Sequence, residues 1–141
     1  MGGSQSTQKI NFEDMQTVVK QSESHLLINT LETNDQSCLI YSTIPCDQEE
    51  NIINKYVKRD PHVKIIIYGK HCNDEKIYTK YNQLISLGFM NVYIYVGGLF
   101  EWMLLQEIYG KELFQTTSII GVRDLLKHKP PQKLNVGLIE Y

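Results

Sequence analysis

Hydrophobic residues along the chain form short blocks that alternate with longer segments in which an apolar residue returns every three or four positions. The short blocks predict β-strands at residues 26–31, 38–41, 63–68 and 91–96. The block at 63–68 is rich in β-branched residues and apolar on both faces. Such a run is typical of a central strand in a covered, usually parallel, sheet.

The longer segments between these blocks predict amphipathic helices. One is expected to start at Asp47, where Asp47 and Glu50 form a capping-box pattern, and to end at Asp60 before a proline. A second covers residues 75–87, and a third runs from the Gly97–Gly98 turn to Gly110. A further short helix is expected near residues 118–127. This alternation predicts an α/β fold with a mainly parallel sheet.

Length and charge narrow the range of functions. The 141 residues fit a single domain, and the formal net charge is −2. Arg59 and Arg123 are the only arginines, so nucleic acid is not an expected partner. No apolar run approaches the roughly 20 residues needed to cross a bilayer.

The cysteines and histidines add further exclusions. Cys38, Cys46 and Cys72 are odd in number and form no C-x-x-C pair, which predicts free thiols in a reducing, cytoplasmic setting. The four histidines show no ligand spacing, so no metal is expected. No glycine-rich phosphate motif occurs, and no cofactor is expected.

The first residues admit two interpretations. Met1 to Ser6 match the M-G-x-x-x-[ST] pattern, in which Gly2 is the lipidation candidate for N-myristoylation. The favoured interpretation is a flexible tail over residues 1–9 or the remnant of an expression tag, because the pattern is short. A single myristoyl chain would support only weak, reversible association with a membrane surface.

The best candidate for chemistry is the segment 69–75, which follows the central strand where ligands bind in parallel sheets. Cys72 lies there between a strand and a helix start. Backbone N–H groups and the helix dipole would stabilise its thiolate. The alternative is a small apolar side chain without a role, which is the interpretation adopted for Cys38 and Cys46.

Charged neighbours of Cys72 act in both directions. Lys70, His71 and Lys76 add positive or titratable charge, whereas Asp74 and Glu75 oppose a thiolate. The sign of any shift in the thiol pKa therefore does not follow from the sequence. His71 also suggests a Cys–His pair, but adjacent residues point in different directions along an extended chain.

Several of these segments together resemble the rhodanese-like domains. The resemblance rests on the strand 65–68, the helix end at Leu87–Phe89, the Asn91–Tyr93 strand and the Gly97–Trp102 turn and helix. It covers roughly residues 10–114 and leaves 115–141 as a C-terminal extension packed on the domain or extending from it. The resemblance implies a single domain with a central, mainly parallel sheet and helices on both faces.

The family resemblance also implies sulfur transfer. A loop cysteine, here Cys72, would take sulfane sulfur from an anionic donor such as thiosulfate as a persulfide and pass it to cyanide or a thiol, including a protein thiol. The anionic sulfur would lie among backbone N–H donors. Substrate-binding roles then fall to the loop residues around it: Lys70, His71, Asn73, Asp74, Glu75, Lys76 and Ile77.

Two departures keep a second hypothesis open. The family's nucleophile usually follows the strand directly, but that position holds Gly69, and Asn29-Thr30-Leu31 lacks the family's Asp-x-Arg. No arginine occurs at residues 73–79, so phosphatase activity is not expected. The favoured hypothesis is a sulfurtransferase that uses Cys72, and the alternative is a catalytically inactive rhodanese-like module for protein binding, with Gly2 as a candidate for myristoylation.

Overall fold

The computed structural model describes residues 7–118 and 126–134 and has a parallel sheet at its centre. The strands are β1 (Lys9–Ile10), β2 (His25–Asn29), β3 (Lys64–Tyr68) and β4 (Asn91–Tyr95). Their order is β1-β4-β3-β2, and each neighbouring pair is parallel. This confirms the predicted α/β fold, with the β-branched run as the inner strand β3.

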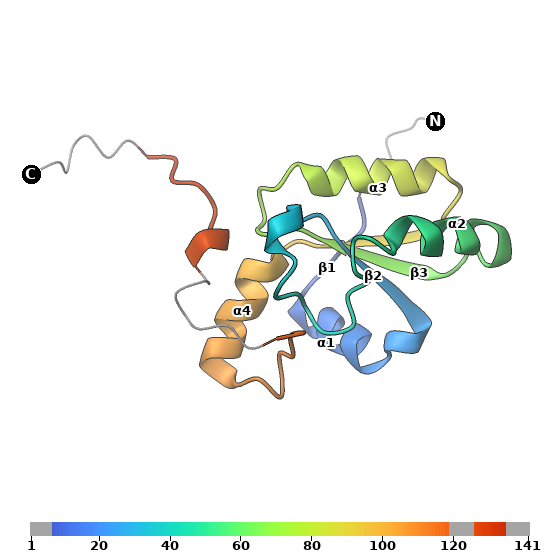
Figure 1. Ribbon diagram of the computed structural model, residues 1–141. Helices are drawn as coiled ribbons and strands as arrows, with labels where there is room; N and C mark the ends of the chain where they lie inside the picture. The colour runs from blue at the N-terminus through green and yellow to red at the C-terminus, as the bar shows by residue number, and fades with distance from the viewer. Residues whose placement is uncertain (1–6, 119–125, 135–141) are drawn as a thin grey trace, which may run out of the picture.

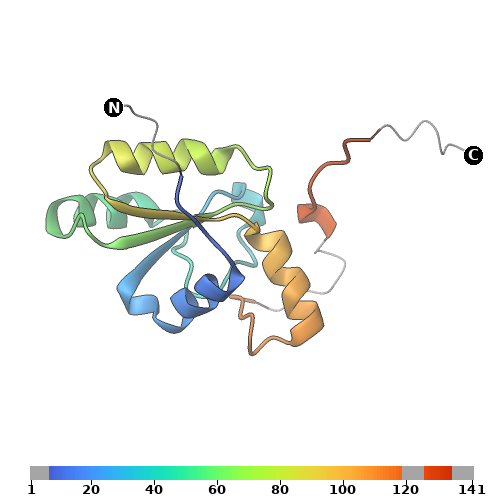
Figure 2. The ribbon, with the colours of Figure 1, turned by 180° about the vertical axis from the view of Figure 1, so that it is seen from behind.

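Two pairs of helices cover the two faces of the sheet (Figures 1 and 2). Helices α1 (Phe12–Lys20) and α4 (Gly98–Tyr109) lie on one face, and α2 (Glu49–Arg59) and α3 (Lys76–Ser86) lie on the other. Short 3-10 turns occur at Ser22–Ser24 and Thr33–Asp35.

The alternation of side chains along β3 divides the core in two. Ile66 and Tyr68 pack in the cluster under α1 and α4, whereas Ile65 and Ile67 pack in the cluster under α2 and α3. Successive strand residues point to opposite faces, so a continuous apolar run is the pattern that a strand covered on both sides requires.

The strand expected at residues 38–41 is wrong. Ile40 forms only an isolated antiparallel bridge with Thr116, and its N–H donates to the Tyr68 hydroxyl at 3.1 Å. The Tyr41 N–H donates to the Gln115 carbonyl at 3.0 Å. The segment is buried against the α1–α4 face of the sheet, so its backbone groups bond to a side chain and a distant loop instead of a neighbouring strand.

Helix α1 was not predicted from the sequence, although it begins with a capping box. The Asn11 side chain accepts the Asp14 N–H at 3.0 Å, and the Asp14 carboxylate accepts the Asn11 N–H at 3.2 Å. The capping box expected at Asp47 is wrong, because α2 starts one residue later with Gln48 as N-cap and no side-chain bond.

The segments before α1 and after α4 both bond to the rest of the domain. The Gln8 carbonyl accepts the Ile94 N–H at 2.8 Å and Lys9 pairs with Ile94, although both residues fall in the predicted tail 1–9. At the other end Phe114 is buried, and the Trp102 indole N–H donates to the Gln115 carbonyl at 2.9 Å. Most of the helix expected near 118–127 lies outside the described residues. Within residues 7–118 and 126–134, no helix is long and apolar enough to cross a membrane.

Candidate functional site

The loop at residues 69–75 joins β3 to α3 at the carboxyl edge of the sheet, and the start of α4 fixes its position. The Leu99 N–H donates to the Gly69 carbonyl at 2.9 Å, and the Phe100 N–H donates to the Lys70 carbonyl at 2.8 Å. Gly98 makes this approach feasible. Its φ is +70°, and a Cβ there would stand 2.8 Å from the Gly69 carbonyl oxygen.

A carboxylate, that of Asp74, lies at the centre of the loop. It accepts the Lys76 N–H at 3.1 Å through one oxygen and the Lys70 N–H at 3.4 Å through the other. A Cβ added to Gly69 would lie only 2.6 Å from Asp74 Oδ2. The carboxylate therefore fills the space that a side chain at position 69 would need.

His71 completes the internal bonding of the loop. Its side chain is buried, Nδ1 accepts the Asn73 N–H at 3.1 Å, and its carbonyl accepts the Asp74 N–H at 3.4 Å. Burial lowers the pKa of His71; the Asp74 charge raises it and the Lys70 charge lowers it. An imidazole with Nδ1 as acceptor is in its neutral form.

Four of the five N–H groups in the predicted cradle from Asn73 to Ile77 already donate to acceptors within the loop. The Asn73 and Asp74 N–H groups donate to His71, and the Lys76 and Ile77 N–H groups donate to Asp74. The sequence contained one signal for this arrangement: an aspartate two residues before α3, which can accept the N–H groups of a helix start.

Cys72 has an exposed side chain in this loop, so its thiol is accessible to solvent. Of the other two cysteines, Cys46 is exposed and Cys38 is buried, with its thiol directed at the Ser118 carbonyl at 3.4 Å. The buried position of Cys38 agrees with its interpretation as a small core side chain. No disulfide forms among these three residues.

The remaining predicted site residues have separate surroundings. Lys76 forms an ion pair with Glu32, and the Ile77 side chain is buried in the core. Glu75 and Asn73 are exposed. The structure thus brings Lys70, His71 and Asp74 together and directs the side chains of Lys76 and Ile77 elsewhere.

Two further predictions concern ligands and lipid. Among the described residues, no group of three or more histidine, cysteine or carboxylate side chains could hold a metal ion. Gly2 lies outside the described residues, so its lipidation stays a prediction from the sequence.

Comparison with known proteins gives the family. The model of the rhodanese-like domain matches residues 31–105, more than half of the chain. The chain belongs to the rhodanese-like domain family. No curated protein is similar enough in sequence to be recognised as a relative.

Solved structures share the fold of this rhodanese-like domain. A rhodanese-like domain of the Alr3790 protein from Anabaena has 18% identity and a TM-score of 0.55, covering 97% of this chain and 94% of its own. The single-domain sulfurtransferase RDL2 of Saccharomyces cerevisiae has 17% identity and a TM-score of 0.51, covering 77% and 98%.

A larger enzyme contains the same unit. Thiosulfate sulfurtransferase from Pseudomonas aeruginosa has 15% identity and a TM-score of 0.59 over 86% of this chain, and the match spans 23% of the enzyme. The TM-scores of these three structures show a shared fold, and a shared fold does not by itself establish a shared activity.

Proposed function

We propose that this rhodanese-like domain acts by binding a partner protein and that its loop does not transfer sulfur. The observation that carries the proposal is the Asp74 carboxylate, which accepts loop N–H groups at 3.1 and 3.4 Å. The Lys76 N–H belongs to the cradle predicted for an anionic donor such as thiosulfate, Asn73–Ile77, and the Lys70 N–H belongs to the same loop. We infer that the carboxylate of the loop itself occupies the place that a donor anion would need.

The electrostatic cost of adding a second anion is large. Two like unit charges about 4 Å apart repel by about 4 kcal/mol at an effective dielectric constant near 20. That energy corresponds to roughly a thousandfold loss of affinity. Displacing Asp74 instead would break its bonds to the Lys70 and Lys76 N–H groups, so neither route favours a donor anion.

The outer surface of α4 supports a binding role. Leu104, Ile108 and Tyr109 are 40%, 62% and 61% exposed, on a helix that also buries Trp102 and Met103. A helix with apolar residues on its buried and its exposed sides is suited to contact on both. Apolar side chains gathered on a surface are typical of a site that another protein covers.

Sulfur transfer through Cys72 is the second candidate, favoured by the exposed thiol at the carboxyl edge of the sheet. In that reaction the Cys72 thiolate attacks the sulfane sulfur of thiosulfate, forming an S–S bond as sulfite leaves. Cyanide then takes the sulfane sulfur as thiocyanate and the thiolate returns. The loop would have to move Asp74 away from the N–H groups to stabilise the anionic persulfide.

A thiosulfate-to-cyanide assay distinguishes the two candidates. The wild-type protein is compared with Cys72→Ser and with Cys46→Ser, which removes the other exposed thiol and serves as the matched control. Intact mass after incubation with thiosulfate reports any gain of one sulfur atom. We expect no thiocyanate above the protein-free rate and no gain in mass for any of the three.

Turnover by the wild type and by Cys46→Ser that disappears in Cys72→Ser would overturn the binding proposal and establish Cys72 as the nucleophile. A persulfide on Cys72 without turnover would also contradict it, because the closed loop should not stabilise that anion.

A further inference from the structure

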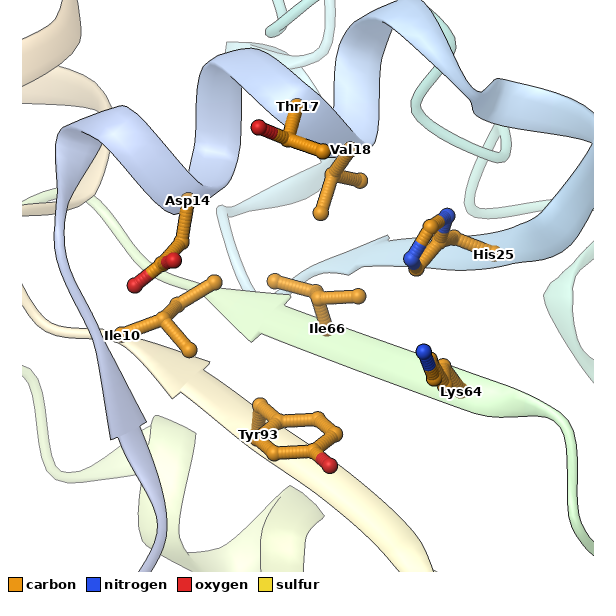
Figure 3. A pocket seen from close by; sticks show the side chains of 8 residues that line it. All are labelled: Ile10, Asp14, Thr17, Val18, His25, Lys64, Ile66 and Tyr93. Atoms are coloured by element: carbon orange, nitrogen blue, oxygen red, sulfur yellow. The ribbon is translucent and has the colours of Figure 1, made fainter.

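A small cavity lies between α1 and the sheet (Figure 3), on the face that α1 covers, and no residue of the Cys72 loop lines it. Its volume is about 230 Å³. Pockets for drug-sized ligands measure roughly 300–1,000 Å³, so this cavity suits a smaller molecule. It is lined by residues of α1 and of each of the four strands: Ile10, Asp14, Thr17, Val18, His25, Lys64, Ile66 and Tyr93.

The floor of the cavity is apolar. Ile66 of β3 and Val18 of α1 are 2% and 5% exposed, and Ile10 and the Tyr93 ring extend the same surface. Figure 3 shows Ile66 between the ring of Tyr93 and Val18. This surface favours a ligand with a flat or branched hydrocarbon body, because such a body can contact Val18 of α1 on one side and the apolar strand residues on the other.

One end of the cavity carries a cation, the Lys64 ammonium group, with His25 beside it. Lys64 and His25 are register partners at the starts of β3 and β2, and both side chains lie at the end opposite Asp14 (Figure 3). Among the residues that the structure describes, no carboxylate lies within 4.0 Å of the Lys64 ammonium group. The cation is therefore available to a ligand.

The polar rim also defines the orientation of the ligand. His25 Nδ1 lies 2.9 Å from the Gln21 carbonyl and must donate to it, so Nε2 of the neutral ring is an acceptor and is not a donor to a carboxylate. The Tyr93 hydroxyl offers a further donor on the same side as Lys64. Asp14 at the opposite end repels an anion, so a negatively charged group is directed to Lys64.

We propose that this cavity binds a small carboxylate with an apolar body, its carboxylate on Lys64 and its hydrocarbon part on Ile66, Val18 and Tyr93. The site is independent of the proposed protein-binding role and of the Cys72 loop. Nothing in its chemistry requires a cofactor or a reaction.

The test is a titration of the ¹⁵N-labelled protein with 3-phenylpropionate, followed by amide chemical shifts. The uncharged analogue 3-phenylpropionamide has the same body and removes only the charge. Lys64→Gln removes the cation, and Lys58→Gln, also exposed but on α2 across the sheet, is the matched control. Both positions are exposed, so both variants should keep the wild-type spectrum outside the substituted site.

We expect saturable shifts at His25, Ile66 and Tyr93 with a dissociation constant of about 1 mM or tighter, as for small ligands of this size. The acid should bind wild type and Lys58→Gln about five- to tenfold better than the amide does. In Lys64→Gln that preference should disappear. Absence of saturable shifts at the cavity, or an unchanged acid-to-amide preference in Lys64→Gln, would overturn the proposal.

Discussion

Asp74 changes the chemistry of the loop with a single side chain. The Lys70 and Lys76 N–H groups donate to this carboxylate of the same loop, so they are not free to bind an external anion. A Cβ at position 69 would stand 2.6 Å from this carboxylate. The position of the Asp74 carboxylate therefore requires a glycine at position 69.

His71 gives the loop a dependence on pH. Because burial lowers its pKa in the folded protein, the unfolded chain binds the proton more readily than the folded protein does. The contribution of His71 to the free energy of unfolding should therefore be constant at pH values above its pKa in the unfolded chain, about 6.5. Below that pH the free energy of unfolding should fall as the pH decreases. Protonation of Nδ1 would also remove the acceptor of the Asn73 N–H.

Urea denaturation between pH 8 and pH 5 measures this effect for the wild type and for His71→Asn. The variant should lose part of the decrease in stability toward low pH, whatever its stability at pH 8. Parallel pH profiles for the two proteins would show that His71 does not titrate differently on folding.

At the scale of elements, the carboxyl edge of the sheet depends on how closely α4 approaches the loop after β3. Two N–H groups of the first turn of α4 donate to the Gly69 and Lys70 carbonyls. The positive end of this helix therefore faces carbonyl oxygens of the protein itself. The approach requires Gly98, because its φ is +70° and backbone atoms of His71 stand about 3 Å from where a Cβ would lie.

Gly98→Ala should destabilise the fold by about 2 kcal/mol or more, because it adds a backbone clash to the strain of a positive φ. Gly88→Ala is the matched control. Gly88 also has a positive φ, of +106°, but nothing lies within 4 Å of its Cβ position, so it should cost about 1 kcal/mol. The free energy of unfolding in urea measures both, and equal losses would contradict the close approach of α4.

At the scale of the whole molecule, the segment after α4 returns to the core. Phe114 is 2% exposed, and its ring centroid lies 5.0 Å from that of Trp102 in an edge-on contact. The adjacent residues bond to the segment at 38–41, through Tyr41 to Gln115 and Thr117 to Leu39. Phe114 thus belongs to the core cluster under α1 and α4, and Gln115 and Thr117, beyond the sequence-predicted boundary at 114, bond to the folded segment at 38–41.

Phe114→Ala should lower the free energy of unfolding by about 3–5 kcal/mol, because it leaves a cavity beside the rings of Trp102, Phe12 and Tyr109. The neighbouring Leu113 is 56% exposed, and Leu113→Ala should change stability by only about 0.5 kcal/mol. Thermal and urea unfolding compare the two. A small effect of Phe114→Ala would mean that the segment after α4 is not part of the cooperative fold.

The two capping-box patterns show why local sequence patterns predict helix starts only in part. Asn11 and Asp14 form a reciprocal capping box, whereas the same type of pattern at Asp47 lies in a turn in which the Gln48 N–H donates to the Pro45 carbonyl. Both patterns satisfy the local rule for a helix start. Tertiary packing decides at which residue each helix starts, and so which of the two patterns caps a helix.

The sequence by itself determined three of the four strands, three of the four helices and the family, because hydrophobic period and glycine positions are local properties that a covered parallel sheet uses directly. It missed β1 and α1 and predicted a strand at 38–41 that does not form. It also located the loop at 69–75. Only the tertiary structure decided what that loop holds, since the acceptors of its N–H groups come from side-chain directions and from the approach of α4. The cavity beside Lys64 likewise joins α1 to all four strands, and no spacing along the chain could bring those side chains together.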